Sequence, residues 1–191
     1  MTRKAALLPA ALVLLASPAF AANQIQNAQF TTDTTTDWLP GLWGATWVGT
    51  EGDTALGAAR VDATSASGSI GAAAISQCTT ATPGTYDFGG AFKIEPTSTQ
   101  TGGARLRVTW YTGADCTGTS TIGDSVDPAT AVGWQPLAVN DTTAPAGTAS
   151  VLIELIQSVS GAGTFTAYWD DIYFGTDPTT LPVRLQSFEV E

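Results

Sequence analysis

The residue types that carry catalytic chemistry are unevenly represented in this chain. It contains no histidine, two cysteines and six tryptophans, and 17 Asp and Glu residues stand against 7 Lys and Arg. Without histidine, Ser-His-Asp and Cys-His catalysis and His-ligated zinc are excluded. Asp170 and Asp171 are adjacent, so on a strand they point to opposite sides, whereas a glycosidase needs two carboxylates that face each other across one bond. The residues predict a protein that is not an enzyme.

The first residues predict export. Arg3 and Lys4 precede an apolar run over residues 5–16, and Ala19-Phe20-Ala21 supplies a small-x-small cleavage site, which together are typical of a signal peptide over residues 1–21. We therefore expect a secreted protein, extracellular or periplasmic. The run is too short to cross a bilayer and no longer apolar run follows, so no membrane insertion is expected. The acidic chain has no basic stripe, which argues against nucleic acid as a partner.

Cys78 and Cys116 are the only cysteines in the chain. An oxidising compartment favours a disulfide between them, and two buried free thiols are the alternative. Neither cysteine has a histidine or a basic cluster beside it, so a reactive thiol is not expected.

The elements that must position these residues are strands. In the run over residues 105–111, Leu106, Val108 and Trp110 alternate with polar residues. Residues 150–157 predict a strand buried on both faces except at Glu154, and residues 168–174 a strand with the two aspartates in its middle. Such period-2 runs, separated by Gly, Pro, Asp and Thr turns, indicate an all-β fold, an antiparallel β-sandwich or barrel. We expect one domain over residues 22–175, followed by a tail or extra strand over 176–191.

The order of several short motifs resembles a known group of proteins. The motifs are Asn27-Ala-Gln-Phe30, Ile75-Ser-Gln-Cys78, Pro83-Gly-Thr-Tyr-Asp-Phe88, Trp134-Gln-Pro-Leu137, Ala144-Pro-Ala-Gly-Thr148 and Tyr168-Trp-Asp-Asp-Ile-Tyr-Phe174. Together they resemble, over residues 23–175, the jelly-roll carbohydrate-binding modules with a galactose-binding-like fold that are attached to bacterial xylanases and cellulases. The resemblance implies a jelly-roll β-sandwich of bacterial origin that binds a polysaccharide or cell-surface glycan without catalysis.

The same resemblance implies a structural calcium where the opening segment meets the closing strand. Asp170 and Asp171 stand at the closing positions, while Thr31 replaces the family's opening glutamate and Asp33 is the candidate substitute. Asp170 shares its parity with Tyr168, Ile172 and Phe174, which predicts that it points inward, where a carboxylate needs a partner or a metal. The alternative is that Asp170 accepts backbone hydrogen bonds in a turn while Asp171 is solvated.

Two sets of side chains are candidates for glycan contact. Trp43 and Trp47 have glycine neighbours and would share one face of a strand, and exposed rings can stack on sugars. Trp110 and Trp134 are expected in the core. On the face away from the core, Arg107, Tyr111, Lys93 and Glu154 would form a polar stripe if their strands are neighbours.

Two functions remain compatible with the sequence. The first is non-catalytic binding of a glycan through Trp43, Trp47, Arg107, Tyr111 and Glu154. The second is an extracellular structural or adhesive surface protein without a glycan ligand, because a fold does not fix a ligand.

Overall fold

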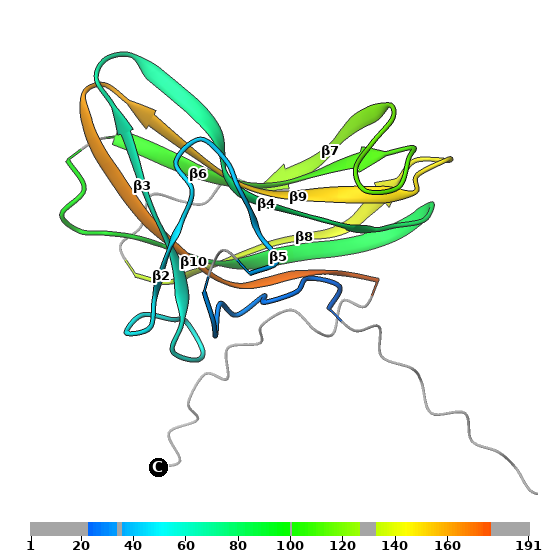
Figure 1. The fold of residues 1–191 in the computed structure, drawn as a ribbon, viewed down its shortest axis with the longest axis horizontal. Coiled ribbons are helices and arrows are strands. Elements are labelled where there is room, and N and C mark those ends of the chain that lie inside the picture. The colour runs from blue at the N-terminus through cyan, green and yellow to red at the C-terminus, as the bar shows by residue number, and fades with distance from the viewer. Residues whose placement is uncertain (1–22, 34–35, 100, 127–132, 177–191) are drawn as a thin grey trace, which may run out of the picture.

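The computed structural model describes residues 23–33, 36–99, 101–126 and 133–176, and this part of the chain is built entirely of antiparallel strands, turns and loops (Figure 1). No helix among the described residues is long and apolar enough to span a membrane. The predicted signal peptide and nearly all of the predicted tail lie outside the described residues.

In the described part of the chain, ten strands form two five-stranded sheets that pack face to face as a jelly-roll β-sandwich (Figure 1). The first sheet has the order β1-β4-β9-β6-β7, with β1 Leu39–Pro40, β4 Ser69–Thr80, β9 Ser150–Ser160, β6 Thr101–Tyr111 and β7 Ser120–Val126. The second has the order β2-β3-β10-β5-β8, with β2 Thr46–Val48, β3 Ala58–Ser65, β10 Gly163–Gly175, β5 Gly84–Ile94 and β8 Gln135–Ala144. The all-β prediction is confirmed.

The core forms because alternate residues of each strand point between the sheets. In β6, Leu106, Val108 and Trp110 are buried there, as their alternation predicted. Trp169 of β10 packs against Phe92 of β5 with ring centroids 5.0 Å apart. Trp134, in contrast, is only partly buried and is not part of the core cluster, so the prediction that it is a core residue was wrong.

A β-bulge interrupts the pairing of β10 with β5 between Asp170 and Tyr173. Asp171 has a φ of +49° at this point. Tyr168 and Asp170 lie on the outer side of the sheet, opposite the core residue Trp169, whereas Ile172 is in the core. The expectation that Asp170 shares the inward face with Ile172 and Phe174 was therefore wrong, because the extra residue of a bulge reverses the alternation beyond it.

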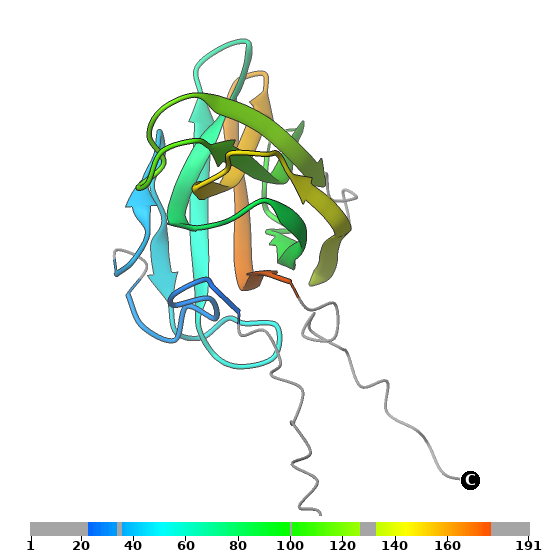
Figure 2. The ribbon, with the colours of Figure 1, turned by 90° about the vertical axis from the view of Figure 1, so that its right-hand side faces the viewer.

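The opening segment closes one end of the sandwich beside the end of β10 (Figure 2). The backbone N–H of Gln24 donates to the carbonyl of Phe174 over 3.0 Å, and that of Ile172 donates to the carbonyl of Ala28 over 2.9 Å. Residues 150 and 144 positions apart in sequence are thus joined, which brings the expected opening and closing motifs together.

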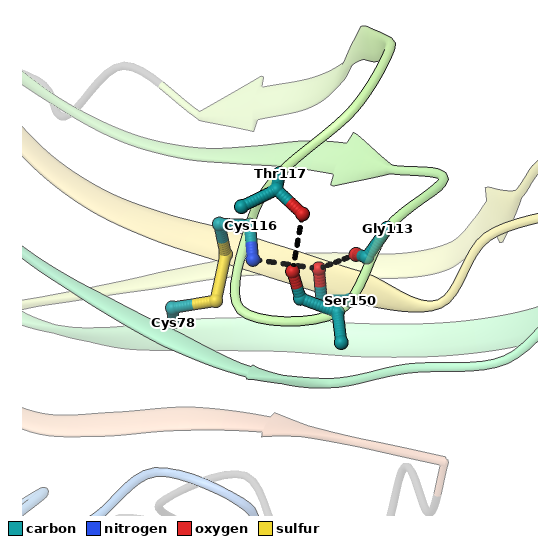
Figure 3. The surroundings of a disulfide bond; sticks show 6 residues. Cys78, Gly113, Cys116, Thr117 and Ser150 are labelled. Atoms are coloured by element: carbon teal, nitrogen blue, oxygen red, sulfur yellow. Dashed lines mark hydrogen bonds between the residues drawn. A yellow bond between two sulfur atoms is a disulfide. The ribbon is translucent and has the colours of Figure 1, made fainter.

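A disulfide joins Cys78 of β4 to Cys116 in the loop between β6 and β7, with Cα atoms 6.0 Å apart, which confirms the predicted pairing. The loop is also held by Ser150 at the start of β9, whose hydroxyl accepts from the Cys116 N–H over 2.9 Å and donates to the Gly113 carbonyl over 2.6 Å (Figure 3). The loop therefore reaches from β6 across the start of β9 to β4.

Candidate binding site

Three neighbouring strands of the first sheet present their outward residues in rows. Because β4 pairs with β9 and β9 pairs with β6, outward residues of the three strands lie opposite one another. The three rows that matter here are Gly71–Ser158–Gly103, Ala73–Ile156–Arg105 and Ser76–Glu154–Arg107. Each row runs from β4 across β9 to β6.

A groove of about 510 Å³ lies over the first two rows and reaches Arg107. Its floor is low because Gly71 and Gly103 have no side chain. A Cβ atom added to Gly71 would meet only the Cβ of Ser158 at 3.5 Å and the carbonyl of Gln157 at 4.0 Å, both ordinary contact distances. The groove is therefore space that small residues leave above a continuous sheet, and a larger side chain at position 71 would enter it.

Arg107 is held at one side of this groove by Glu154. The guanidinium donates from Nε to Glu154 Oε2 over 2.9 Å and from Nη2 to Oε1 over 3.0 Å, and the Thr109 hydroxyl donates to Oε2 over 3.0 Å. The side chain of Glu154 is 11% exposed and that of Arg107 29%. A two-point ion pair of this kind fixes the plane of the guanidinium.

Tyr111 lies on the same outward face of β6, four residues beyond Arg107 and half-buried. Arg107, Glu154 and Tyr111 therefore do share a face, as the polar stripe required. Lys93 does not, and its inclusion was wrong: it lies in β5 of the second sheet. There its ammonium pairs with Glu51 over 2.5 Å and lies 4.9 Å from the ring centroid of Tyr168.

The two candidate tryptophans lie at the edges of the sheets and do not line the groove. Trp43 follows β1, is partly buried against the core, and donates from its indole N–H to the Thr64 carbonyl of β3 over 3.3 Å. Trp47 in β2 is 42% exposed and donates to the Phe30 carbonyl over 2.6 Å. Only Trp47 belongs to a strand, so the expectation of one shared strand face was wrong.

The aspartate pair of β10 is buried, with Asp170 1% and Asp171 6% exposed. The carboxylate of Asp170 accepts from the backbone N–H groups of Asp53 and Asp171, both over 2.7 Å. That of Asp171 accepts from the Gln29 amide over 3.0 Å and the Thr54 hydroxyl over 2.8 Å. The pair thus ties the opening segment and the loop over residues 49–57 to β10, and the alternative of a solvated Asp171 is excluded.

Burial raises the pKa of Asp170 to about 7, and the charge of Asp171 adds to this increase in pKa, although the hydrogen bonds from Asp53 and Asp171 oppose it. The two carboxylates are oxygen ligands of the kind that calcium prefers, whereas Gln29 presents its Nε2–H group and Thr54 its hydroxyl to Asp171. Each carboxylate oxygen that accepts one hydrogen bond keeps a further lone pair. The carboxylate oxygens and the Thr54 hydroxyl oxygen therefore have the chemistry that calcium prefers.

The third acid expected for that site is not gathered with the pair. Asp33 is exposed, and no three His, Cys, Asp or Glu side chains of the described residues lie together in a way that could hold a metal ion. Any ion at the pair would have to complete its ligand shell with neutral oxygens such as the hydroxyl of Thr54.

Similar solved structures share this architecture. A family 61 carbohydrate-binding module in complex with β-1,4-galactotriose superposes with a TM-score of 0.54 at 20% identity, over 80% of this chain and 97% of that one. A family 16 carbohydrate-binding module gives a TM-score of 0.54 at 18% identity, over 80% and 99% of the two chains. The fold is that of jelly-roll carbohydrate-binding modules.

The same fold also serves other chemistry. A Stig cyclase from Fischerella sp. TAU, in complex with an indole compound, superposes with a TM-score of 0.56 at 15% identity, over 83% of this chain and 98% of that one. No protein-family model and no curated protein matches the chain in sequence. The likeness therefore establishes the fold, and the function has to be argued from the site.

Sequence reasoning did not find the residues that shape the groove. Gly71, Gly103 and Ile156 carry no signal of a binding site by themselves. Arg105 was placed on the polar side of its strand by alternation, but nothing in the sequence indicated that β4 would lie two strands away from β6.

Proposed function

We propose that this chain is a secreted, non-catalytic carbohydrate-binding protein that takes a single glycan chain in the groove over β4, β9 and β6. The observation that carries the proposal is the groove itself, an open space of about 510 Å³ on a sheet face with an oriented guanidinium at its side. The carbohydrate-binding modules that share the fold support it.

The dimensions and chemistry of the groove suit a sugar chain. Three strands span about 10 Å, since neighbouring strands lie about 4.8 Å apart, which is wide enough for one polysaccharide chain. Arg105 and Arg107 offer donors for hydroxyl oxygens, and Ile156 offers an apolar surface for sugar C–H groups. A few placed polar groups on a largely apolar floor are what orients a ligand in a binding site.

The groove does not offer the machinery of a glycosidase. Glu154 is the carboxylate next to its lining, and both of its oxygens are bonded to Arg107. An acid–base pair needs a second carboxylate at a defined distance across the scissile bond, and none of the described residues that line the groove is acidic. This supports a role in binding.

We also propose a structural calcium at Asp170 and Asp171. The ion would neutralise two adjacent buried carboxylates whose described hydrogen bonds come from neutral donors. Its role would be to hold the opening segment and the 49–57 loop on β10, away from the groove. Without calcium, the hydrogen bonds alone would hold the pair, and chelation separates the two possibilities.

Affinity electrophoresis of the domain through a panel of polysaccharide gels tests the glycan proposal. Gly71→Val places a side chain in the groove, so we expect retardation by the preferred glycan to be lost while the protein stays folded. Gly84→Val is the matched control, because Gly84 is also an exposed strand glycine without a positive φ and lies in the second sheet. The heavy atoms nearest to a Cβ added there would be 3.9 Å away, an ordinary contact distance.

Each outcome of this experiment is informative. Retardation of the wild type and of Gly84→Val, but not of Gly71→Val, would support the groove. Equal retardation of all three proteins would show that the glycan binds outside the groove. The surface around Trp43 and Trp47 would then be tested next. No retardation of folded wild type in any gel would contradict glycan binding and favour an extracellular structural or adhesive protein.

A further inference from the structure

The outer face of the first sheet is covered at one end and open at the other. Along β9 the outward residues become more exposed from the start of the strand to its end: Ser150 is 1% exposed and Glu154 8%, whereas Ser158 and Ser160 are exposed. These four side chains point to the same side, because they are an even number of residues apart on one strand. The sheet face is therefore covered at the start of β9.

The cover is the loop between β6 and β7. Its Cys116 is joined to Cys78, which lies in the outward row next to that of Glu154, so the disulfide stands on the outer face of the sheet. One row further on, the hydroxyl of Ser150 accepts from the Cys116 N–H and donates to the Gly113 carbonyl (Figure 3). The loop is thus fixed to the sheet face at two points.

The ion pair of Arg107 and Glu154 stands between this loop and the groove. It bridges β6 and β9 with two hydrogen bonds. Of the described residues of β6, those that line the groove extend from Gly103 to Arg107 and no further. Four residues of a strand span about 13 Å. Measured along the strands, the groove is therefore a short trough that ends at the ion pair.

The other end of the trough is lined by small side chains. The row Gly71–Ser158–Gly103 contains two glycines and a serine. In the last row of β4 and β9, the hydroxyl of Ser69 donates to that of Ser160 over 3.2 Å, and both residues are exposed. A glycan can leave the groove at this end, whereas at the other end it meets the ion pair and, behind it, the loop.

We propose that the groove binds the terminal residues of a glycan chain and not its interior. The inference rests on the proposed glycan-binding function and names the substrate class of that site: chain ends and short oligosaccharides. The reason is steric. A chain that lies along the strands stops at Arg107 and Glu154, so its last residue contacts the pair while the rest of the chain leaves past Ser158.

The amount of protein bound per chain end tests this directly. The probe is the soluble polysaccharide that retards the wild type most strongly among β-1,4-galactan, xylan and β-glucan. Limited acid hydrolysis raises the number of its chain ends, counted by a reducing-sugar assay, at constant mass. In isothermal titration calorimetry we expect the protein bound per gram to rise in proportion to the chain ends. A capacity that follows mass and ignores chain ends would overturn the inference and leave glycan binding intact.

Capped oligosaccharides identify which end is bound. A trisaccharide of the same backbone is compared with its benzyl glycoside, capped at the reducing end, and with a form that carries a benzyl ether on the non-reducing terminal residue. We expect one cap to abolish binding, because it collides with the closed end, and the other to be tolerated at the open end. Tolerance of both caps would overturn the closed end, and loss with both caps would overturn the open end.

Two variants place this binding in the groove. Gly71→Val is expected to lose binding of the uncapped trisaccharide, and the matched Gly84→Val to keep it. A folded Gly71→Val protein that binds the trisaccharide like the wild type would overturn the inference. Failure of every glycan, polymer or oligosaccharide, to bind the folded wild type would contradict the proposed function, and the inference would fall with it.

Discussion

Substituting Arg107 and substituting Glu154 are expected to lower the free energy of unfolding by different amounts, although the two side chains form one ion pair. The Glu154 side chain is 11% exposed and accepts three hydrogen bonds, whereas the Arg107 side chain is 29% exposed. Arg107→Gln removes two of those bonds and leaves a buried carboxylate that keeps the bond from Thr109. Glu154→Gln leaves a guanidinium that water can reach. The first substitution should therefore cost more stability than the second.

The burial of the two side chains sets the expected loss of stability for each substitution. Removing one partner of a fully buried pair costs about 3–5 kcal/mol, and partial access of water reduces this to about 2–3 kcal/mol for Arg107→Gln. For Glu154→Gln we expect about 1 kcal/mol. Because the two side chains act as a unit, the double variant should cost about 1 kcal/mol less than the sum of the single variants.

Urea unfolding of the four proteins measures these differences through the midpoint at constant slope. The exposed pair Arg60–Asp62, with side chains 40% and 45% exposed, supplies the control: Arg60→Gln should cost less than about 0.5 kcal/mol. The reasoning is refuted if Glu154→Gln destabilises as much as Arg107→Gln, or if the double variant equals the sum of the two.

Three further outcomes follow from the structure. Replacing both Cys78 and Cys116 by serine should cost about 4 kcal/mol, since the disulfide closes a 38-residue interval and the loop-entropy estimate gives that amount; a thermal midpoint within a degree of the wild type would contradict this. Chelation should lower the thermal midpoint of the wild type but not of Asp171→Asn, and an unchanged wild type would show that hydrogen bonds alone hold the aspartate pair. Trp47→Ala, which loses an indole bond to Phe30, should lower the free energy of unfolding by about 1 kcal/mol without changing glycan affinity; a loss of affinity would place the site at the sheet edge.

The fold was predictable from local patterns because alternation is a local property. Leu106, Val108 and Trp110 of β6 point inward as their spacing indicated, and the disulfide followed from the number of cysteines and the expected export. The prediction failed in β10, where Asp171 adopts a positive φ within a bulge. A bulge adds one residue on one strand only, and the alternation of apolar and polar residues does not indicate where that residue is inserted.

The candidate site was only partly predictable because it depends on which strands become neighbours. Arg107, Tyr111 and Glu154 were placed on one face correctly, since β6 and β9 pair directly. Lys93 was misplaced because β5 belongs to the other sheet, which is decided by pairings far apart in the sequence. The groove is open at Gly71 and Gly103 because glycine has no side chain. Two glycines far apart in the sequence indicate such an open space only when the pairing of their strands is known.

If the proposed groove is the binding site, binding and stability can be separated in this molecule because they use opposite faces of the same strands. In β9, Ile153 and Leu155 fill the core, while Ile156 and Ser158 line the groove. A substitution at an outward position such as Gly71 therefore leaves these core contacts in place, and a loss of affinity in a variant shown to be folded reports on the groove. Glu154 is the exception, since it points outward and is nevertheless buried. Its substitution should change both properties, and this is why Gly71, rather than Glu154, is the position that tests the site.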